Sequence, residues 1–255
     1  MDDEPPLNPT NSLGLRLVMG VVAPATNTTV QPEMEALRPE GVINAHARIP
    51  NPDWLVATDA DAASARAAMV AGLGAALDTL VPARPDHVIL GVMVENFVGD
   101  GEAGAKLLAD ASARVGCPVT ATTHAILAAL AALDIRRIAL LSPFMPEGER
   151  AARRFLEAAG HEVVRSHAMA IPGPAAIARV PLMRLREAVR ELDCPEAEAI
   201  VQVGTNLPFA GVALEAETAL GKPVIASNPA TYWHALRRAG IDDRRSDAGR
   251  LFRSA

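Results

Sequence analysis

The residues from Leu15 to Thr29 constrain the fold of this chain more than any other stretch. They read LRLVMGVVAPATNTT, an apolar run of strand length that is interrupted only by Arg16, ends at Pro24 and is followed by small hydroxyl and amide residues. A helical pattern begins at Val30. This pattern predicts a buried strand of a parallel sheet, and open α/β sheets bind ligands at the carboxyl ends of their strands.

The polar loop after this strand is therefore a candidate binding site. Its side chains and backbone N–H groups can donate hydrogen bonds to an anion at the start of the helix. The alternative is that they form a turn and cap the helix, and the stretch alone favours neither. The loop residues are Thr26, Asn27, Thr28 and Thr29.

Strand-like and helix-like segments alternate along the rest of the chain. Further strands are expected over residues 41–49, 87–93, 117–121, 136–142, 162–169, 199–203 and 223–226. Helices are expected over residues 31–37, 58–80, 102–115, 122–133, 146–159, 174–192 with a break at Pro181, 209–220 and 229–239. This alternation predicts an α/β fold with parallel sheets flanked by helices.

A short repeat predicts that the fold has two similar lobes. The frame G-x-P-V-x-A-x-x-x-A occurs at Gly116 and again at Gly221, an offset of 221 − 116 = 105 residues. We expect a flexible segment over 1–14, a first lobe over 15–134 with a contribution from 221–241, a second lobe over 135–220, and a surface tail over 242–255.

If the lobes face each other, four strand ends converge on one cleft that suits a small polar, carboxylate-bearing molecule. The expected lining residues are Pro24, Thr26, Asn27, Thr28, Met93, Glu95, Asn96, Phe144, Gly204, Thr205 and Asn206.

Composition argues against several classes of partner. The net charge is −6 and no basic stripe with interleaved aromatic residues occurs, so nucleic-acid binding is not expected. Every apolar run is shorter than the roughly 20 residues that span a bilayer. The acidic, proline-rich start lacks the features of a signal peptide, which predicts a cytoplasmic protein. Cys117 and Cys194 form neither a disulfide framework nor a metal-ligand spacing, so no metal is expected.

Two segments carry a family resemblance. Gly20 to Thr29, followed by Pro32-Glu33, resembles the G-x-x-x-P-x-x-N-T-x-x-x-P-E opening of maleate cis-trans isomerases, and the tail from Gly221 to Arg237 resembles theirs as well. Arylmalonate decarboxylases and, more distantly, aspartate/glutamate racemases are relatives of these enzymes. The resemblance covers about Leu15 to Ile241. It implies the two-lobed, pseudo-symmetric parallel α/β fold of the racemases, chemistry without a cofactor, and compatibility with a homodimer.

The same resemblance identifies a divergent member. Enzymes of this family typically use a pair of cysteines, one from each lobe, as nucleophile or as opposed acid and base. The residues at those positions here are Met93 and Gly204. Phe144 stands where a tyrosine is common, and Gly173 or Pro174 where an asparagine is common. Chemistry that depends on thiols is therefore not expected.

Glu95 is the acid expected at the carboxyl edge of the first sheet. Desolvation beside Met93 and Phe97 would raise its pKa towards the range of a useful general base. The alternative is that Glu95 caps the following helix or pairs with an arginine. By analogy of position, Asn27 and Asn206 are expected to bind a substrate carboxylate or carbonyl.

Two functions remain open from the sequence. One is a cofactor-independent enzyme acting on a small carboxylate by acid–base chemistry without cysteine, as an isomerase, a decarboxylase or other lyase, or a hydrolase. The other is a ligand-binding or regulatory protein on the same scaffold without turnover. Of the histidines, His234 is expected beneath the sheet rather than in the site, and His46 and His124 have no partner that the sequence identifies.

Overall fold

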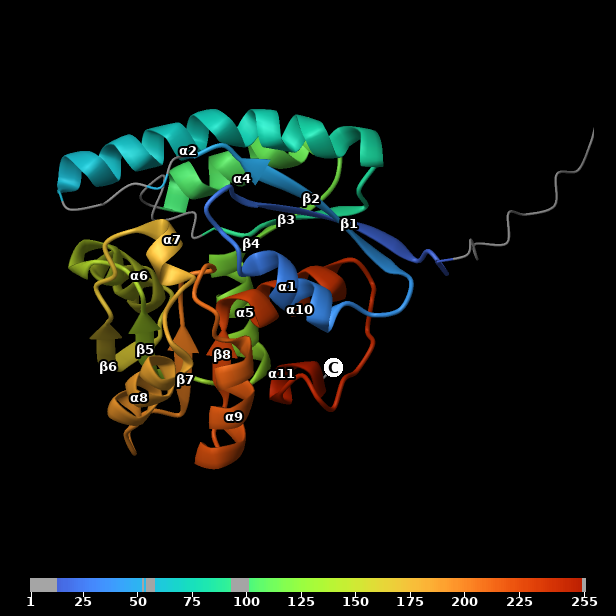
Figure 1. Cartoon of the computed structure of the whole chain (residues 1–255). Coiled ribbons are helices and arrows are strands. Elements are labelled where there is room, and N and C mark those ends of the chain that lie inside the picture. The colour runs from blue at the N-terminus through green and yellow to red at the C-terminus, as the bar shows by residue number, and fades with distance from the viewer. Residues whose placement is uncertain (1–12, 52, 54–57, 93–100, 254–255) are drawn as a thin grey trace, which may run out of the picture.

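The computed structural model describes residues 13–51, 53, 58–92 and 101–253, which form two four-stranded parallel sheets (Figure 1). The strands are β1 (Leu17–Pro24), β2 (Val42–Ile49), β3 (His87–Leu90) and β4 (Val119–Ala121) in one sheet, and β5 (Arg137–Ser142), β6 (Glu162–Ala168), β7 (Ala199–Gln202) and β8 (Val224–Ala226) in the other. The orders β2-β1-β3-β4 and β6-β5-β7-β8 are the same topology used twice. The predicted two-lobed α/β fold is confirmed.

Helices connect and cover the strands. They are α1 (Val30–Leu37), α2 (Asp59–Leu80), α4 (Gly101–Val115), α5 (Thr122–Ala132), α6 (Pro146–Ala158), α7 (Pro174–Ile177), α8 (Leu182–Leu192), α9 (Ala210–Leu220), α10 (Ser227–Arg238) and α11 (Arg250–Arg253), with a 3-10 turn over Val81–Ala83. The break expected at Pro181 is present, since α7 ends at Ile177 and Pro181 is the N-cap of α8. Proline disfavours helical geometry in the residue before it, here Val180, so one helix cannot continue through this position.

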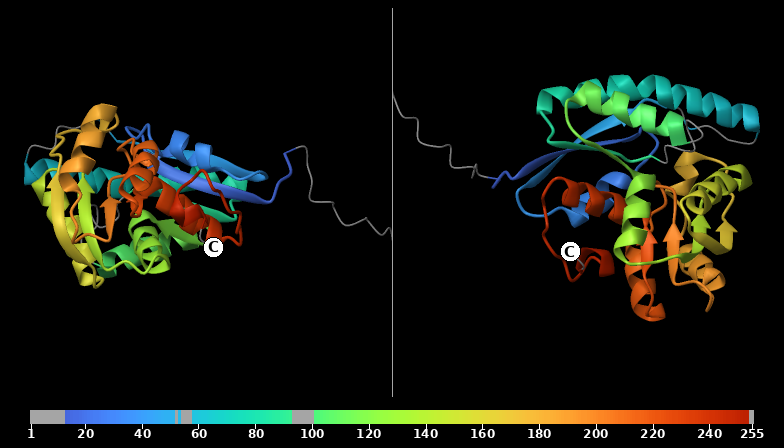
Figure 2. Two further views of the ribbon diagram at one scale, coloured as in Figure 1. Left: turned by 90° about the horizontal axis from the view of Figure 1, so that it is seen from below. Right: turned by 180° about the vertical axis from the view of Figure 1, so that it is seen from behind.

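The first sheet is covered on both faces. Helices α2 and α4 lie side by side over one face, where Leu73 and Leu77 pack in one cluster with Leu90 (Figures 1 and 2). Helices α1 and α10 cover the other face, where Met34 and Tyr232 belong to the central core. Helix α10 follows the last strand of the second sheet but packs against β3 and β4 of the first, which ties the two halves together.

The second sheet is also enclosed. Helices α8 and α9 contribute Leu185 and Val212 to a cluster with Ile200 of β7. The opposite side of β7, with Val201, joins the central core together with Ile126 of α5 and residues of α6.

The repeat frame has a structural explanation. Its glycines, Gly116 and Gly221, have φ values of 73° and 68°, a left-handed conformation that ends a helix and that glycine adopts without strain. The hydroxyl that opens each following helix makes an equivalent contact: Thr122 Oγ1 donates to the Leu90 carbonyl, and Ser227 Oγ to the Gln202 carbonyl. The two frames are therefore equivalent in contacts as well as in sequence.

The C-terminal part differs from the surface tail that the sequence predicted. Residues Leu251 and Phe252 of α11 are buried against the central core.

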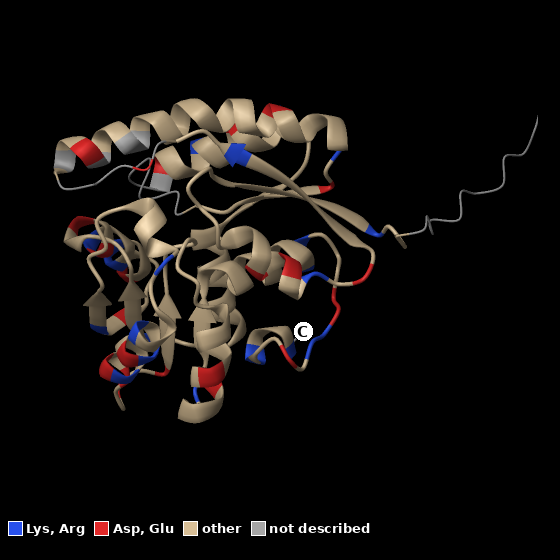
Figure 3. Ribbon diagram, in the orientation of Figure 1, with Lys and Arg blue, Asp and Glu red and all other residues tan. Residues whose placement is uncertain are grey.

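Basic and acidic residues are interspersed on α6 and α8 (Figure 3). Among the described residues, none of the helices combines the length and apolarity that a membrane span requires.

Candidate active site between the lobes

The loop after β1 and the loop after β7 meet between the lobes. The Asn27 side chain donates from Nδ2 to Thr205 Oγ1 at 3.1 Å, and the Thr205 hydroxyl in turn donates to the carbonyl of Gly91, beyond the end of β3, at 2.8 Å. Asn27 is 2% exposed and Thr205 7% exposed, so water competes little for these bonds. Residues that follow three strand ends, far apart in sequence, thus lie together.

Asn206 cross-links the same region. Its Oδ1 accepts from Thr28 N at 3.0 Å, and its Nδ2 donates to the carbonyls of Thr26 at 3.2 Å and Pro174 at 2.7 Å. Thr29 Oγ1 donates to the backbone carbonyl of Asn206. Because both amide hydrogens of Asn206 already have acceptors, in this structure the residue holds the loop geometry rather than offering a free donor.

The backbone N–H groups of the β1 loop differ from the expectation of a free anion site. Asn27 N donates to the Pro24 carbonyl, and the N–H groups of Thr29 and Val30 donate to Asn27 Oδ1. Thr28 N is held by Asn206, as described above. Oxygen atoms of the protein therefore already accept the hydrogen bonds of these N–H groups, as in a helix cap. The Thr28 side chain is exposed.

Three further residues near this loop lie outside the set of expected lining residues. Arg48 donates from Nη1 to the Asn27 carbonyl at 2.6 Å, and Asn51 donates from Nδ2 to Thr26 Oγ1 at 3.0 Å. Asp53 accepts from Ala175 N of α7 across the lobes at 3.1 Å. All three lie at or just beyond the end of β2. Their position at the end of an expected strand was therefore the sequence signal that could have identified them.

The residue at the second family thiol position has a backbone that excludes a side chain. Gly204 has a φ of +99°, and a Cβ there would lie 2.6 Å from Cγ of Pro143 and 3.3 Å from Cζ of Phe144. Phe144, half-buried, thus closes over Gly204 where a tyrosine was expected to donate a hydrogen bond. A cysteine at position 204 would be strained and would collide with a rigid ring.

Both cysteines lie away from the cleft. Cys117 precedes the amino end of β4, and burial raises the pKa of its thiol. Cys194 is buried in the turn between α8 and β7, within the cluster beneath α8 and α9. Both are at the opposite end of their strands from the carboxyl ends that meet between the lobes.

The remaining predicted residues of the first lobe, Met93, Glu95 and Asn96, lie outside the residues that the structure describes, as does Phe97. Their predicted roles stay predictions. Within the described part of the chain, no group of three or more His, Cys, Asp or Glu residues could hold a metal ion.

Glu33, the acid of the Pro32-Glu33 pair, joins the lobes behind this site. Its Oε1 accepts from Ala210 N at the start of α9 at 2.9 Å, and its Oε2 accepts from Asn228 Nδ2 in the first turn of α10 at 2.7 Å. Burial raises the pKa of Glu33 to about 7, although these hydrogen bonds act in the opposite direction. The sequence marked Glu33 only as part of a motif.

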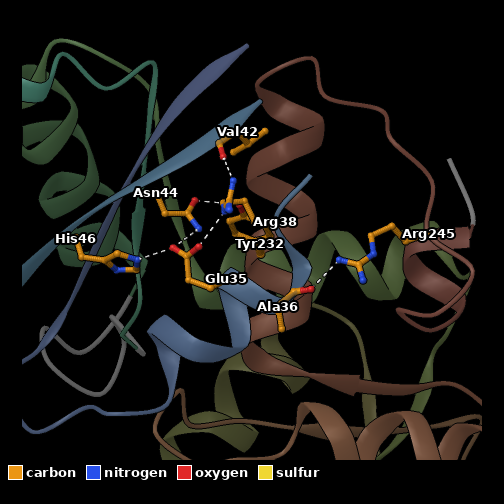
Figure 4. A network of polar contacts seen from close by, with 8 residues as sticks. All are labelled: Glu35, Ala36, Arg38, Val42, Asn44, His46, Tyr232 and Arg245. Carbon is orange, nitrogen blue, oxygen red and sulfur yellow. Dashed lines mark hydrogen bonds and ion pairs between the residues drawn. The ribbon is translucent and has the colours of Figure 1, made fainter. Parts of the chain in front are cut away.

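A second polar network lies on the outer side of α1 (Figure 4). The Glu35 carboxylate accepts from Asn44 at 3.0 Å and from Arg38 at 2.9 Å, and it lies 3.1 Å from Nε2 of His46. Burial opposes ionisation of Glu35, but these hydrogen bonds outweigh it and lower its pKa. Tyr232 OH donates to Asn44 Oδ1 and so connects α10 to this network. The network therefore pairs His46 with Glu35 and connects β2, α1 and α10.

The other two histidines that the sequence singled out, His124 and His234, differ in burial. Burial lowers the pKa of His234, which lies on α10 beside Trp233. His124, in the first turn of α5, is exposed.

Comparisons with known proteins agree with this architecture. Residues 88–252 match the family model described as arylmalonate decarboxylase. A maleate isomerase of Nocardia farcinica is 27% identical over 257 aligned positions, covering 94% of this chain and 97% of the relative. An arylmalonate decarboxylase of Bordetella bronchiseptica is 32% identical over 140 residues, which are 54% of this chain and 58% of the relative.

Among solved structures, the Nocardia farcinica maleate cis-trans isomerase bound to TRIS aligns with a TM-score of 0.84 at 23% identity, covering 93% of this chain and 98% of that one. A crystal structure of arylmalonate decarboxylase aligns with a TM-score of 0.74 at 22% identity, covering 93% of this chain and all of that one (100%). These likenesses show the shared fold.

Proposed function

The chain belongs to the arylmalonate decarboxylase family, and from this premise we propose that it is a cofactor-independent enzyme that acts on a small carboxylate without a catalytic cysteine. The observation that carries the proposal is the meeting of Asn27 and Thr205 between the lobes, at strand ends from which both thiols are remote. Amide and hydroxyl groups in a closed site stabilise an oxyanion or a carboxylate. The curated relatives described above are a maleate isomerase and an arylmalonate decarboxylase.

The available donors favour Asn27 as the ligand-binding amide. One of its amide hydrogens is used by Thr205, and its Oδ1 is fixed by two backbone N–H groups, so the orientation of the amide is set before a ligand arrives. The second amide hydrogen has no acceptor in the part of the chain that the structure describes. We assign it to a carboxylate or enolate oxygen of the substrate, with the Thr205–Asn206 pair holding it in place.

Glu95 remains the proposed general base. By the family resemblance Glu95 is expected near Met93, and a carboxylate in a desolvated site can move a proton near neutral pH. Isomerisation, decarboxylation, and hydrolysis or hydration all pass through enolate-like or tetrahedral oxyanions, so the donors described here do not select among these reactions.

A substrate panel followed by proton NMR in deuterated water tests the proposal. The panel comprises maleate, malonate derivatives, ring-opened pyridine catabolites and cyclic imides. We expect deuterium incorporation, isomerisation or ring opening of at least one compound by the wild type and loss of that conversion in Glu95→Gln. Unchanged turnover in Glu95→Gln would remove Glu95 from its assigned role. Binding without conversion over hours would instead support a ligand-binding protein.

A further inference from the structure

Glu33 stands where the first helix of one half meets two helix starts of the other. Its two carboxylate oxygens are divided between Ala210 N of α9 and Asn228 Nδ2 of α10. Helix α9 begins directly after residues 204–209, which include Thr205 and Asn206; we refer to this segment as the 204–209 turn. The Glu33 carboxylate therefore fixes the end of the turn that enters α9.

A continuous path of hydrogen bonds runs from Glu33 to the candidate site. The same Asn228 amide that donates to Glu33 also donates to the Thr205 carbonyl at 2.9 Å. The Thr205 hydroxyl then accepts from Asn27. One amide group thus joins the Glu33 carboxylate to the residue that orients the proposed ligand-binding amide.

We propose that Glu33 is a positioning residue that sets the geometry of the 204–209 turn for ligand binding, and that a proton on its carboxylate loosens this geometry. The proposal rests on the proposed function, because it assigns the turn to ligand binding. Its structural half, the coupling of Glu33 to the turn, is measurable without any turnover.

In the part of the chain that the structure describes, the groups that contact the Glu33 carboxylate are hydrogen-bond donors. A proton on either oxygen therefore removes one of the two accepted bonds. The carbonyl oxygen of the Asn228 side chain is buried and has no partner among the described residues. An amide that turned this oxygen towards protonated Glu33 would withdraw its N–H from the Thr205 carbonyl, which passes the change on to the site.

Charged groups on the neighbouring elements do not pair with Glu33. On its own helix, Glu35 is engaged in the outer network of Figure 4. On α9 the first charged residue is Glu215, which pairs with Arg186. On α10 the first two titratable residues are Tyr232, whose hydroxyl donates to Asn44, and His234 beside Trp233. The proton equilibrium of Glu33 is therefore set by burial and by neutral donors, and its pKa near 7 places it within the physiological range.

The chain supplies a matched control. Glu149 is the fourth residue of α6, as Glu33 is the fourth residue of α1, and each helix follows the first strand of its sheet. Glu149 is buried, but its carboxylate has no hydrogen bond or ion pair within the described residues, and its Oε1 is unpartnered. Replacing Glu149 by Gln changes the same residue type at the equivalent place without touching the 204–209 turn.

Two-dimensional 1H–15N NMR of the full chain from pH 5.5 to 8.5 tests the proposal. We expect the amide signals of Ala210, Thr205 and Thr28 to titrate together with a midpoint near pH 7 in the wild type and in Glu149→Gln. In Glu33→Gln they should remain at their low-pH positions throughout. Signals of Thr205 and Thr28 that do not move, or a titration that persists in Glu33→Gln, would overturn the proposal.

Any compound that the substrate panel identifies provides a second readout. For that compound we expect Glu33→Gln to raise KM about tenfold at pH 8, the effect of one lost hydrogen bond, with kcat nearly unchanged. The difference from wild type should disappear at pH 6. A fall in kcat with constant KM would contradict a positioning role. Absence of turnover in the wild type would count against the proposed function and leave the NMR result standing.

Discussion

Glu33 and Glu149 occupy equivalent places in the two halves, yet their surroundings differ. The Glu33 carboxylate accepts two hydrogen bonds from the other half of the molecule, whereas Glu149 is buried without a hydrogen-bond partner in the described part of the chain. Within the described residues, the halves therefore share a frame of strands and helices, and the polar contacts described behind the candidate site are those of Glu33. The difference indicates that the connection behind the candidate site depends on the first-half acid.

The largest expected effect comes from removing each acid in turn. Glu33→Ala leaves the Ala210 N–H and the Asn228 amide without their acceptor, and we expect it to lower the free energy of unfolding by about 3 kcal/mol at pH 6. Glu149→Ala should cost about 1 kcal/mol or less, because the described residues give its carboxylate no hydrogen bond to lose. Chemical denaturation followed by circular dichroism measures both values. Equal losses would show that the two acids are equivalent after all.

The residues that follow the third strand of each sheet also differ between the halves. A cysteine substituted at each of these positions measures how well each strand end accepts a side chain. Val92 and Gly204 each lie two residues beyond the end of the third strand of their sheet. Gly204→Cys forces a side chain into a left-handed backbone against Pro143, so we expect a loss of about 2 kcal/mol or more. Val92→Cys, a change of similar volume, should cost about 1 kcal/mol. The melting temperatures of the two variants test this difference in stability. A Gly204→Cys variant that melts at the wild-type temperature would mean that the backbone around position 204 adapts to a side chain.

The pH dependence of stability follows from the pKa of Glu33. Its folded value of about 7 exceeds its ordinary value of 4.5, so the folded protein holds the proton more tightly than the unfolded chain. This contribution is complete below the unfolded pKa and is lost as the pH rises through 7.

Relative to Glu33→Gln, the wild type should therefore lose stability between about pH 4.5 and 7, by up to roughly 1.4 kcal/mol per pH unit, and then level off. Parallel denaturation curves of the two proteins at every pH would refute this dependence.

The smallest effect is expected for Glu149→Gln. A neutral amide of the same shape replaces a carboxylate that makes no hydrogen bond in the described residues, so the free energy of unfolding should change by less than about 0.5 kcal/mol at pH 7. A large loss measured in the same denaturation assay would reveal that Glu149 has a partner as important as that of Glu33.

The sequence predicted the frame better than the contacts. Hydrophobic runs and helix breakers are local signals, so the strands, the break at Pro181 and the repeated glycine frame followed from them directly. The meeting of Asn27 with Thr205 followed from the position of both residues at strand ends. These features need no knowledge of which side chains face each other.

The missed features depend on contacts between distant parts of the chain. Glu33 and Ala210 are 177 residues apart, and nothing in the local sequence pairs them. The close approach of Pro143 to the Cβ position of Gly204, which together with the positive φ disfavours a thiol there, is likewise a contact that the local sequence does not reveal. The three hydrogen bonds of the Asn206 side chain belong to the same class, since Thr26 and Thr28 lie in the β1 loop and Pro174 opens α7.

The central claim is that this member of the family works without a thiol. The most direct test compares the wild type with Cys117→Ala/Cys194→Ala, using the deuterium-incorporation assay and the substrate that the panel identifies. Because both cysteines lie away from the strand ends that meet between the lobes, we expect the cysteine-free variant to keep its kcat within about twofold of wild type while Glu95→Gln loses it. Loss of turnover in the cysteine-free variant, with the fold intact by circular dichroism, would contradict the claim.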